Sequence, residues 1–170
     1  MTFSYMPNVG YGPLRFGMTP LEVETILGEP SSFRSPFEGI PLPDDDQDLL
    51  RHCEGLRFME FPQTRTSHQF PQVSFDRDRV TGFTLFDIKV PFLLNGIDLF
   101  ARSRKATLAA LAANETEYFE NGERFLFQAQ GVELPNAKYA KTLPYVSLVD
   151  ATYVLAHRDF NFLEPSTSLG

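Results

Sequence analysis

The spacing of hydrophobic residues predicts a short helix near the start of the chain. Apolar side chains recur at helical spacing over residues 21–27, and Thr19 stands before them as a good N-cap. Pro20 suits the first helical position, where its missing N–H costs nothing, and Glu22 completes a capping box with Thr19. Gly28 is suited to end the helix. Both ends of this helix are therefore predicted from the sequence.

After this helix the pattern changes to short apolar runs, which predict antiparallel strands. Residues 31–48 are rich in proline and aspartate and predict a long loop, and residues 62–70 predict a second one. The strands are expected at residues 49–53, 56–61, 72–75 and 80–86. Residues 76–79 would form the turn between the last two of them.

The second half of the chain follows the same order in outline. Ser103 is a suitable N-cap for a helix over residues 104–113, with a weaker apolar stripe than the first helix. The elements expected after it are a hairpin about Asn121-Gly122 with strands at 117–120 and 124–128, and a last long strand at 145–156. Residues 130–134 also resemble residues 54–58.

These elements favour an α+β fold made of two helix-plus-antiparallel-sheet units in tandem. The first unit would span residues 1–90 and the second residues 91–170, and together they would form one compact domain with one continuous curved sheet. The match between the halves is one of pattern, with few identities. The alternative is that such caps and hairpins occur in any α+β protein.

Composition and charge narrow the classes of function. Hydrophobic residues make up 42% of the chain, which is enough for a packed interior. The net charge of −7 repels nucleic acid and anionic lipid, so we expect no nucleic-acid and no membrane partner, and a basic protein would be attracted. The single cysteine, Cys53, allows no internal disulfide. Residues 1–10 lack a signal-peptide pattern, so the expected compartment is the cytoplasm.

The sequence offers no recognisable catalytic or metal-binding constellation. His52 and Cys53 are adjacent, and adjacent residues on a strand point to opposite faces, so they are poor joint metal ligands. The other histidines are His68 and His157, and a nucleophilic pair of Cys53 with His68 has no support in the pattern. Residues 44–46 lack the ligand spacing of a calcium loop. We therefore expect no enzyme activity, no metal and no cofactor.

One segment resembles a known family. Residues 14–30, Leu-Arg-Phe-Gly-Met-Thr-Pro-Leu-Glu-Val-Glu-Thr-Ile-Leu-Gly-Glu-Pro, resemble the opening of BamE-like repeats, and residues 73–80 resemble their Phe-Asp hairpin. The second half matches only in outline, because Ala101-Arg102 replaces Gly-Met and residues 112–114 replace Gly-Glu-Pro. Two tandem copies of such a unit resemble the beta-lactamase inhibitor protein architecture, in which a concave sheet grips an enzyme.

The resemblance implies a scaffold for binding a protein, and it implies the partner only weakly because one fold hosts many functions. The BamE lipoprotein needs a signal peptide and a lipid-bearing cysteine, and the secreted inhibitor needs disulfides. A cytoplasmic protein on this scaffold would fit the bacterial immunity proteins, which neutralise a cognate toxin inside the producing cell. The partner would then be a toxin or effector, and a nuclease toxin would be basic.

We expect the partner to contact acidic residues and neighbouring aromatic residues, because aromatic anchors ringed by charges are typical of protein interfaces. The candidate partner-binding residues are Asp44, Asp45, Asp46, Asp48, Glu60, Phe70, Glu117, Tyr118, Phe119 and Glu120. Two alternatives stay open. The protein could be a BamE-like structural adaptor or assembly factor, or a small enzyme whose site the sequence does not reveal.

Overall fold

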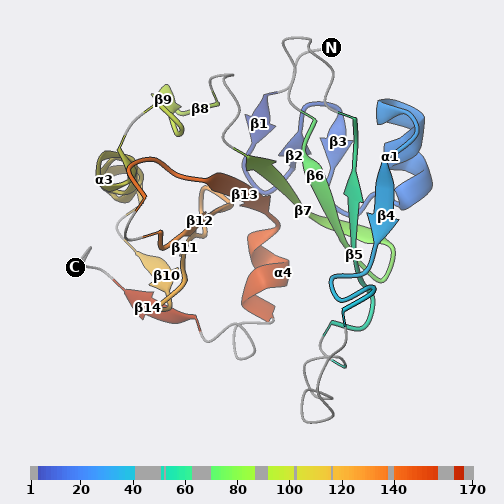
Figure 1. Cartoon of the computed structure of the whole chain (residues 1–170). Coiled ribbons are helices and arrows are strands. Elements are labelled where there is room, and N and C mark those ends of the chain that lie inside the picture. Colours follow the sequence, from blue (N-terminus) through green and yellow to red (C-terminus); the bar gives the residue numbers. More distant parts are fainter. Residues whose placement is uncertain are drawn as a thin grey trace.

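A nine-stranded antiparallel sheet, built from both halves of the chain, dominates the fold (Figure 1). The computed structural model describes residues 4–40, 51, 53–62, 70–86, 92–101, 103–115, 117–137, 140–156 and 163–166. The mixture of helices with antiparallel sheet confirms the α+β class. None of the helices in the described residues is long and apolar enough to cross a membrane.

The strands of the large sheet fall into two groups along the chain. The first group is β4 (Ser32–Arg34), β5 (Leu56–Glu60), β6 (Gln72–Asp76) and β7 (Arg79–Phe86). The second is β10 (Tyr118–Glu120), β11 (Arg124–Phe127), β12 (Val132–Pro135), β13 (Tyr145–Val149) and β14 (Glu164–Ser166). Their order is β14-β10-β11-β12-β13-β7-β6-β5-β4, so the two groups meet where β13 pairs with β7.

Small hairpins and helices complete the fold. The hairpin strands are β1 (Tyr5–Met6), β2 (Gly10–Tyr11), β3 (Leu14–Arg15), β8 (Leu93–Leu94) and β9 (Ile97–Asp98). The helices are α1 (Pro20–Leu27), α3 (Arg104–Asn114) and α4 (Ala151–Ala156). In Figure 1, α1 and α3 lie toward opposite ends of the molecule, and α4 lies between the two groups of strands.

The helix signals predicted from the sequence are confirmed. The Thr19 hydroxyl accepts the Glu22 N–H at 3.4 Å, and the Glu22 carboxylate accepts the Thr19 N–H at 2.8 Å, which is the predicted capping box. Gly28 ends α1 with φ of 90°, in the region that favours glycine. The Ser103 hydroxyl caps α3 by accepting the Ala106 N–H at 3.3 Å. Local polar contacts therefore define both helices.

Two strand predictions are wrong. The expected strand at residues 49–53 is not formed over its described part, because Arg51 is helical and Cys53 lies in a turn. The expected strand at residues 145–156 ends at Val149 and continues as α4. The cause is Asp150, whose carboxylate accepts the N–H groups of residues 152 and 153 at 3.0 and 3.3 Å and so starts a helix.

Two further expectations need correction, and a third is confirmed with an added detail. The loop predicted over residues 31–48 contains β4, which pairs with β5. The hairpin at Asn121-Gly122 is confirmed, but its turn is held by the Asn121 side chain, which accepts two backbone N–H groups at 2.8 and 2.9 Å. Residues 54–58 and 130–134 resemble each other in sequence but do not occupy equivalent positions in the two groups of strands. Gly55 precedes the second strand of its group, whereas Gly131 precedes the third.

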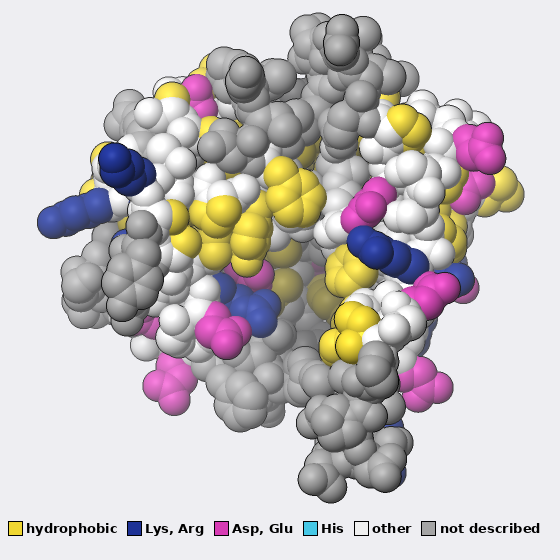
Figure 2. Space-filling model, in the orientation of Figure 1, with side chains coloured by type: hydrophobic (Ala, Val, Ile, Leu, Met, Phe, Trp, Pro, Cys, Tyr) yellow, Lys and Arg dark blue, Asp and Glu magenta, His cyan; other side chains and the backbone are white. Residues whose placement is uncertain are grey.

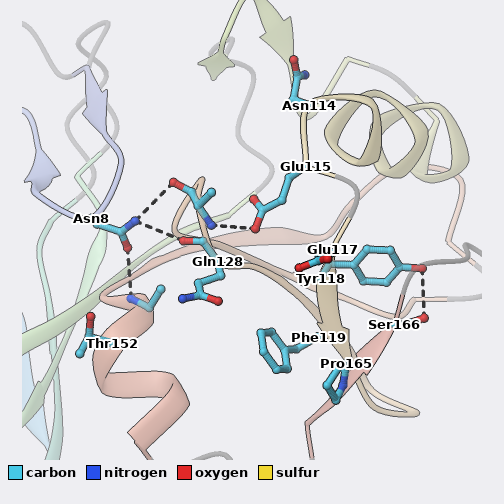
Figure 3. Close-up of a pocket in the computed structure, with 12 residues that line it drawn as sticks. Asn8, Asn114, Glu115, Glu117, Tyr118, Phe119, Gln128, Thr152, Pro165 and Ser166 are labelled. Carbon is cyan, nitrogen blue, oxygen red and sulfur yellow. Dashed lines mark hydrogen bonds between the residues drawn. The ribbon is translucent and has the colours of Figure 1, made fainter.

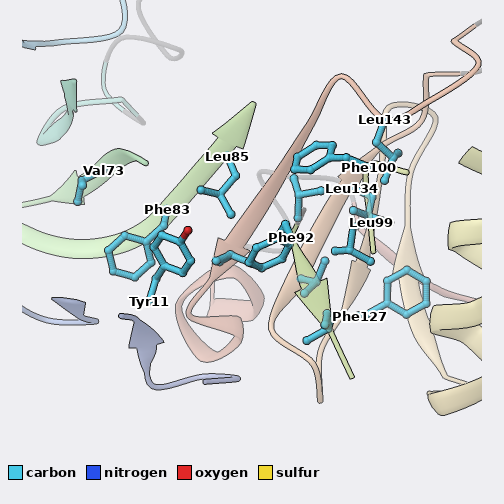
Figure 4. Packing of buried hydrophobic residues seen from close by; sticks show 14 of the residues in the cluster. Tyr11, Val73, Phe83, Leu85, Phe92, Leu99, Phe100, Phe127, Leu134 and Leu143 are labelled. Atoms are coloured by element: carbon cyan, nitrogen blue, oxygen red, sulfur yellow. The ribbon is translucent and has the colours of Figure 1, made fainter. Parts of the chain in front are cut away.

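The main hydrophobic core lies on one face of the sheet, which we call the core face. Val73, Phe83, Leu85, Val146 and Leu148 point to this face and are fully buried. Side chains of α1, α3 and the hairpins cover them. The Tyr11 ring lies 6.3 Å from that of Phe83 and 6.1 Å from that of Phe92 (Figure 4). This packing fixes the sheet and leaves its opposite face available.

Candidate protein-binding surface

The opposite side of the large sheet is only partly covered. Strand residues alternate between faces, so the neighbours of the buried core residues point to this second side. Some residues on this second side do not pack against α4, and we call these residues the open face. Each of them is half-buried or exposed. They are Ser32, Arg34, Phe58, Glu60, Gln72, Thr84, Phe86, Arg124, Glu133, Tyr145 and Ser147.

At one end of the open face, Glu60 is held by three hydrogen-bond donors. Its carboxylate accepts hydrogen bonds from Gln72 at 2.8 Å, from Ser32 at 3.2 Å and from Arg34 at 3.2 Å. Burial alone raises the pKa of Glu60, but these donors and the Arg34 charge outweigh burial, so the pKa lies below its usual value. Glu60 is therefore a stable anion at neutral pH.

At the other end, Arg124 and Glu133 form a looser ion pair. One nitrogen of Arg124 lies 3.4 and 3.5 Å from the two carboxylate oxygens of Glu133. The Glu133 side chain is only 14% exposed, and this burial raises its pKa although Arg124 acts in the opposite direction. The two ends of the open face thus hold carboxylates in contrasting environments.

Polar and aromatic side chains occupy the seam between β7 and β13. The hydroxyls of Thr84 and Ser147 lie 3.2 Å apart across the two strands. The rings of Phe86 and Tyr145, which are cross-strand partners, have centroids 6.4 Å apart. Phe86 is 46% exposed, which is unusual for so large an apolar side chain on a sheet. Figure 2 shows hydrophobic side chains gathered beside a hollow on one side of the molecule.

Helix α4 covers another part of this second side. Val154 and Leu163 pack on Leu126 and Val149 in a small second core. The Tyr153 hydroxyl also hydrogen-bonds to Asp76 in the first half of the chain, and the pKa of Tyr153 is raised by burial and by the Asp76 charge. The helix therefore connects the two groups of strands and borders the open face.

A hollow of about 770 Å³ lies beyond α4 (Figure 3). Asn8 is at its wall, and its amide donates to two carbonyls of residues 128 and 129 at 3.2 and 3.3 Å while accepting the Ala151 N–H at 3.3 Å. The Glu115 carboxylate also lines the hollow and accepts the Ala129 and Gln130 N–H groups at 2.7 and 3.1 Å. These groups are used in holding neighbouring loops together.

The residues predicted to bind a partner do not form one cluster. Glu60 lies on the open face, and Phe70 packs on Phe61 at a ring distance of 6.3 Å and against the main core. The predicted residues that line the hollow are Glu117, Tyr118 and Phe119, although Tyr118 is only 2% exposed. Glu120 points to the core face, opposite Glu164. Asp44, Asp45, Asp46 and Asp48 lie outside the described residues.

The spread of these residues can be estimated from the strand order. β5, with Glu60, and β10, which holds Tyr118, Phe119 and Glu120, are six strand positions apart, or about 29 Å at about 4.8 Å per strand. Only a macromolecule could contact both regions at once. The sequence pattern alone marks none of Phe86, Arg124, Glu133 and Tyr145 as candidates. These residues alternate along their strands with buried residues, and that alternation could have placed them on an exposed face. It identifies a shared face only once β7 is known to pair with β13.

The described residues offer little for catalysis. They contain no group of His, Cys, Asp and Glu arranged to hold a metal ion. Burial raises the pKa of the Cys53 thiol, which opposes the thiolate form that a nucleophile needs. His52, His68 and His157 lie outside the described residues, so the predictions about them stay predictions.

Comparison of the chain with protein families, with curated proteins and with solved structures finds no match. The resemblance to BamE-like repeats therefore stays a prediction based on its residues.

Proposed function

We propose that this protein binds another protein through the open face and acts as an immunity protein, neutralising a cognate bacterial toxin by covering its active site. The observation that carries the proposal is the open face itself, an antiparallel sheet surface with the exposed Phe86 and the half-buried Tyr145 on its middle strands and ion pairs toward both ends. Aromatic anchors surrounded by polar groups are typical of the centres of protein interfaces.

The extent of the open face across the strands suits this role. From β4 to β11 it spans six strand spacings, or about 29 Å. A standard interface covers about 800 Å² on each partner, which corresponds to a disc roughly 32 Å across. The open face matches such a disc across the strands only, because each strand contributes one or two residues to it, so a partner covering its active site with this protein would also contact the elements at the border.

The distribution of charge supports separate regions for attracting the partner and for contacting it. The open face carries Arg34 and Arg124 against Glu60 and Glu133, so these charges balance locally. The excess of acidic residues behind the net charge of −7 therefore lies elsewhere in the chain. We propose that this acidic excess, including the 44–48 segment, attracts a basic partner over long range. The open face would then make the close contact.

We also infer that the two groups of elements are tandem repeats. Each consists of a helix followed by four consecutive antiparallel strands, α1 with β4–β7 and α3 with β10–β13, and the last strands of the two groups pair. This order supports a duplicated unit whose copies share one sheet. The proposed repeats would place the open face across their junction, a position that can contact two sides of a partner's cleft.

A capture experiment with matched variants tests the function. The tagged protein is used to recover partners from its host, and the recovered protein is then purified and assayed with and without the binder. We expect one stoichiometric partner with a toxic enzyme activity that is inhibited at a one-to-one ratio. Phe86→Asp should weaken binding about 30-fold or more, as for a central hot spot. Leu93→Asp is the control, because Leu93 is 60% exposed on the β8–β9 hairpin.

The opposite results would count against the proposal. If Phe86→Asp and Leu93→Asp bind the partner equally well, the open face is not the contact surface. If the partner is a large assembly without enzyme activity, the adaptor alternative replaces the immunity function.

A further inference from the structure

Glu133 occupies an unusual position for a carboxylate. It lies on β12 in the interior of the large sheet, with Ser147 opposite it on β13 and Leu126 opposite it on β11. Its side chain is 14% exposed, so most of the water around the anion has been removed. An ionised group in such a place is costly unless it is well paired.

The pairing of Glu133 is poor by comparison with that of Glu60. Arg124 is the only hydrogen-bond donor to the Glu133 carboxylate among the described residues, at 3.4 and 3.5 Å. Charge-assisted hydrogen bonds are usually about 2.8 Å long, and a carboxylate has room for about four donors. Glu60, on the same face, has three donors at 2.8 to 3.2 Å. The fold can therefore satisfy a carboxylate on this face, and at Glu133 it does not.

The Tyr145 ring lies diagonally across β12 and β13 from this carboxylate, and the Phe86 ring lies one strand farther away. Tyr145 is two residues before Ser147, the cross-strand partner of Glu133. Burial raises the Tyr145 pKa, and the Glu133 charge raises it further. The Tyr145 ring lies next to the Phe86 ring, and Phe86 is 46% exposed. Ring faces attract cations through their electron-rich surface, and they also pack on the apolar stems of Lys and Arg.

From this juxtaposition we propose that Glu133, with the rings of Phe86 and Tyr145, is the point at which an arginine or lysine side chain of the partner protein docks. The proposal rests on the proposed function, because it names the chemistry by which a partner would hold the open face. The incoming cation completes the hydrogen bonding of Glu133, and its stem lies along the rings. A basic partner also complements the net charge of −7.

A small probe tests this site without any partner. The protein is titrated with N-acetyl-arginine methylamide, and with the neutral citrulline analogue of the same shape, while backbone amide signals are followed by NMR. We expect the arginine probe to shift the signals of Glu133, Tyr145 and Ser147 saturably, with an affinity about tenfold or more above that of citrulline. Equal responses to the two probes would overturn the proposal, whatever any variant does.

Matched variants locate the response. Glu133→Gln should abolish the preference for arginine, whereas Glu60→Gln, which removes a carboxylate on the same face about 19 Å away, should leave it within about twofold. A preference that survives in Glu133→Gln would contradict the assignment of this carboxylate.

The same variants separate this inference from the proposed function. If a captured partner loses affinity with Phe86→Asp but not with Glu133→Gln, the open face is the interface and the docking inference is wrong. If the arginine probe binds at Glu133 but no protein contacts the open face, the cation site stands and the proposed function fails.

Discussion

Leu148 of β13 lies directly opposite Phe83 of β7, and both side chains are fully buried where the two groups of strands share their sheet. Strands from separate halves of the chain are thus joined by apolar packing on the core face as well as by backbone hydrogen bonds. The stability of the open face depends on this seam, because the aromatic pair of Phe86 and Tyr145 sits on the other side of the same two strands.

Truncating Leu148 is expected to destabilise the whole protein. Leu148→Ala removes fully buried methyl groups and leaves a cavity, which should lower the free energy of unfolding by about 2–5 kcal/mol. Urea denaturation measures the change, and the loss should appear as one transition for both groups of strands. Leu93→Ala at an exposed position should change stability by less than about 0.5 kcal/mol. Two separate transitions would show that the seam does not couple the halves.

The capping box of α1 gives a second prediction. Thr19→Ala removes the hydroxyl that accepts the Glu22 N–H and should cost about 1 kcal/mol in thermal or urea unfolding. Thr25→Ala on the same helix is the control, because alanine is a better helix former and no cap is lost. Hydrogen bonds from the Thr19 backbone and side chain lower the pKa of Glu22. The capping box therefore stabilises the folded state at pH values above the ordinary Glu pKa of 4.5, and this stabilisation is lost as the pH falls through the lowered pKa.

The sequence pattern predicted those helices and strands that are defined by contacts between residues close together in the chain. Thr19, Glu22 and Gly28 fix α1 through hydrogen bonds and backbone geometry within a few residues of one another, so the pattern was sufficient. β4 was missed because its three residues are a strand only through pairing with β5, more than twenty residues later. The helix after Val149 was missed because apolar residues continue on both sides of Asp150, and Asp150 was not recognised as its cap.

The candidate site was less predictable than the fold. Glu60 was chosen for its charge and does lie on the open face, whereas Tyr118 was chosen as an aromatic beside acidic residues and is buried at 2% exposure. Phe86 and Tyr145 become neighbours only through the β7–β13 pairing, which joins residues almost sixty positions apart. No periodicity in one segment contains that information, because register between distant strands is set by the whole core.

The contact of α4 with the first half of the chain leads to a third prediction. Tyr153→Phe removes the hydroxyl that hydrogen-bonds to Asp76 and should cost about 1 kcal/mol of stability. Hydrogen exchange should become faster in α4 while the core strands stay protected, since α4 carries only a small core of its own. Thr152→Ala, at the neighbouring exposed position, should leave exchange unchanged. Equal effects of the two variants would mean that the hydrogen bond does not hold the helix.

The two carboxylates of the open face should respond to pH in opposite directions. Burial raises the pKa of Glu133, so its charged form costs stability, and Glu133→Gln should be the more stable protein at pH 7, by roughly 1 kcal/mol. Arg124 does not reverse this sign, because its side chain is 33% exposed and can be hydrated once its partner is neutral. The difference in stability should vanish as the pH falls below the ordinary Glu pKa of 4.5, where Glu133 is protonated in both the folded and the unfolded state.

Glu60 is the internal control. Its pKa is lowered, so Glu60→Gln should be less stable than the wild type at pH 7, and the gap should close as acid protonates Glu60. Urea unfolding between pH 4 and pH 8 measures both. A Glu133→Gln variant less stable than the wild type at pH 7 would show that the Arg124 pair is a structural element, and it would remove the reason for expecting a cation from a partner at this carboxylate.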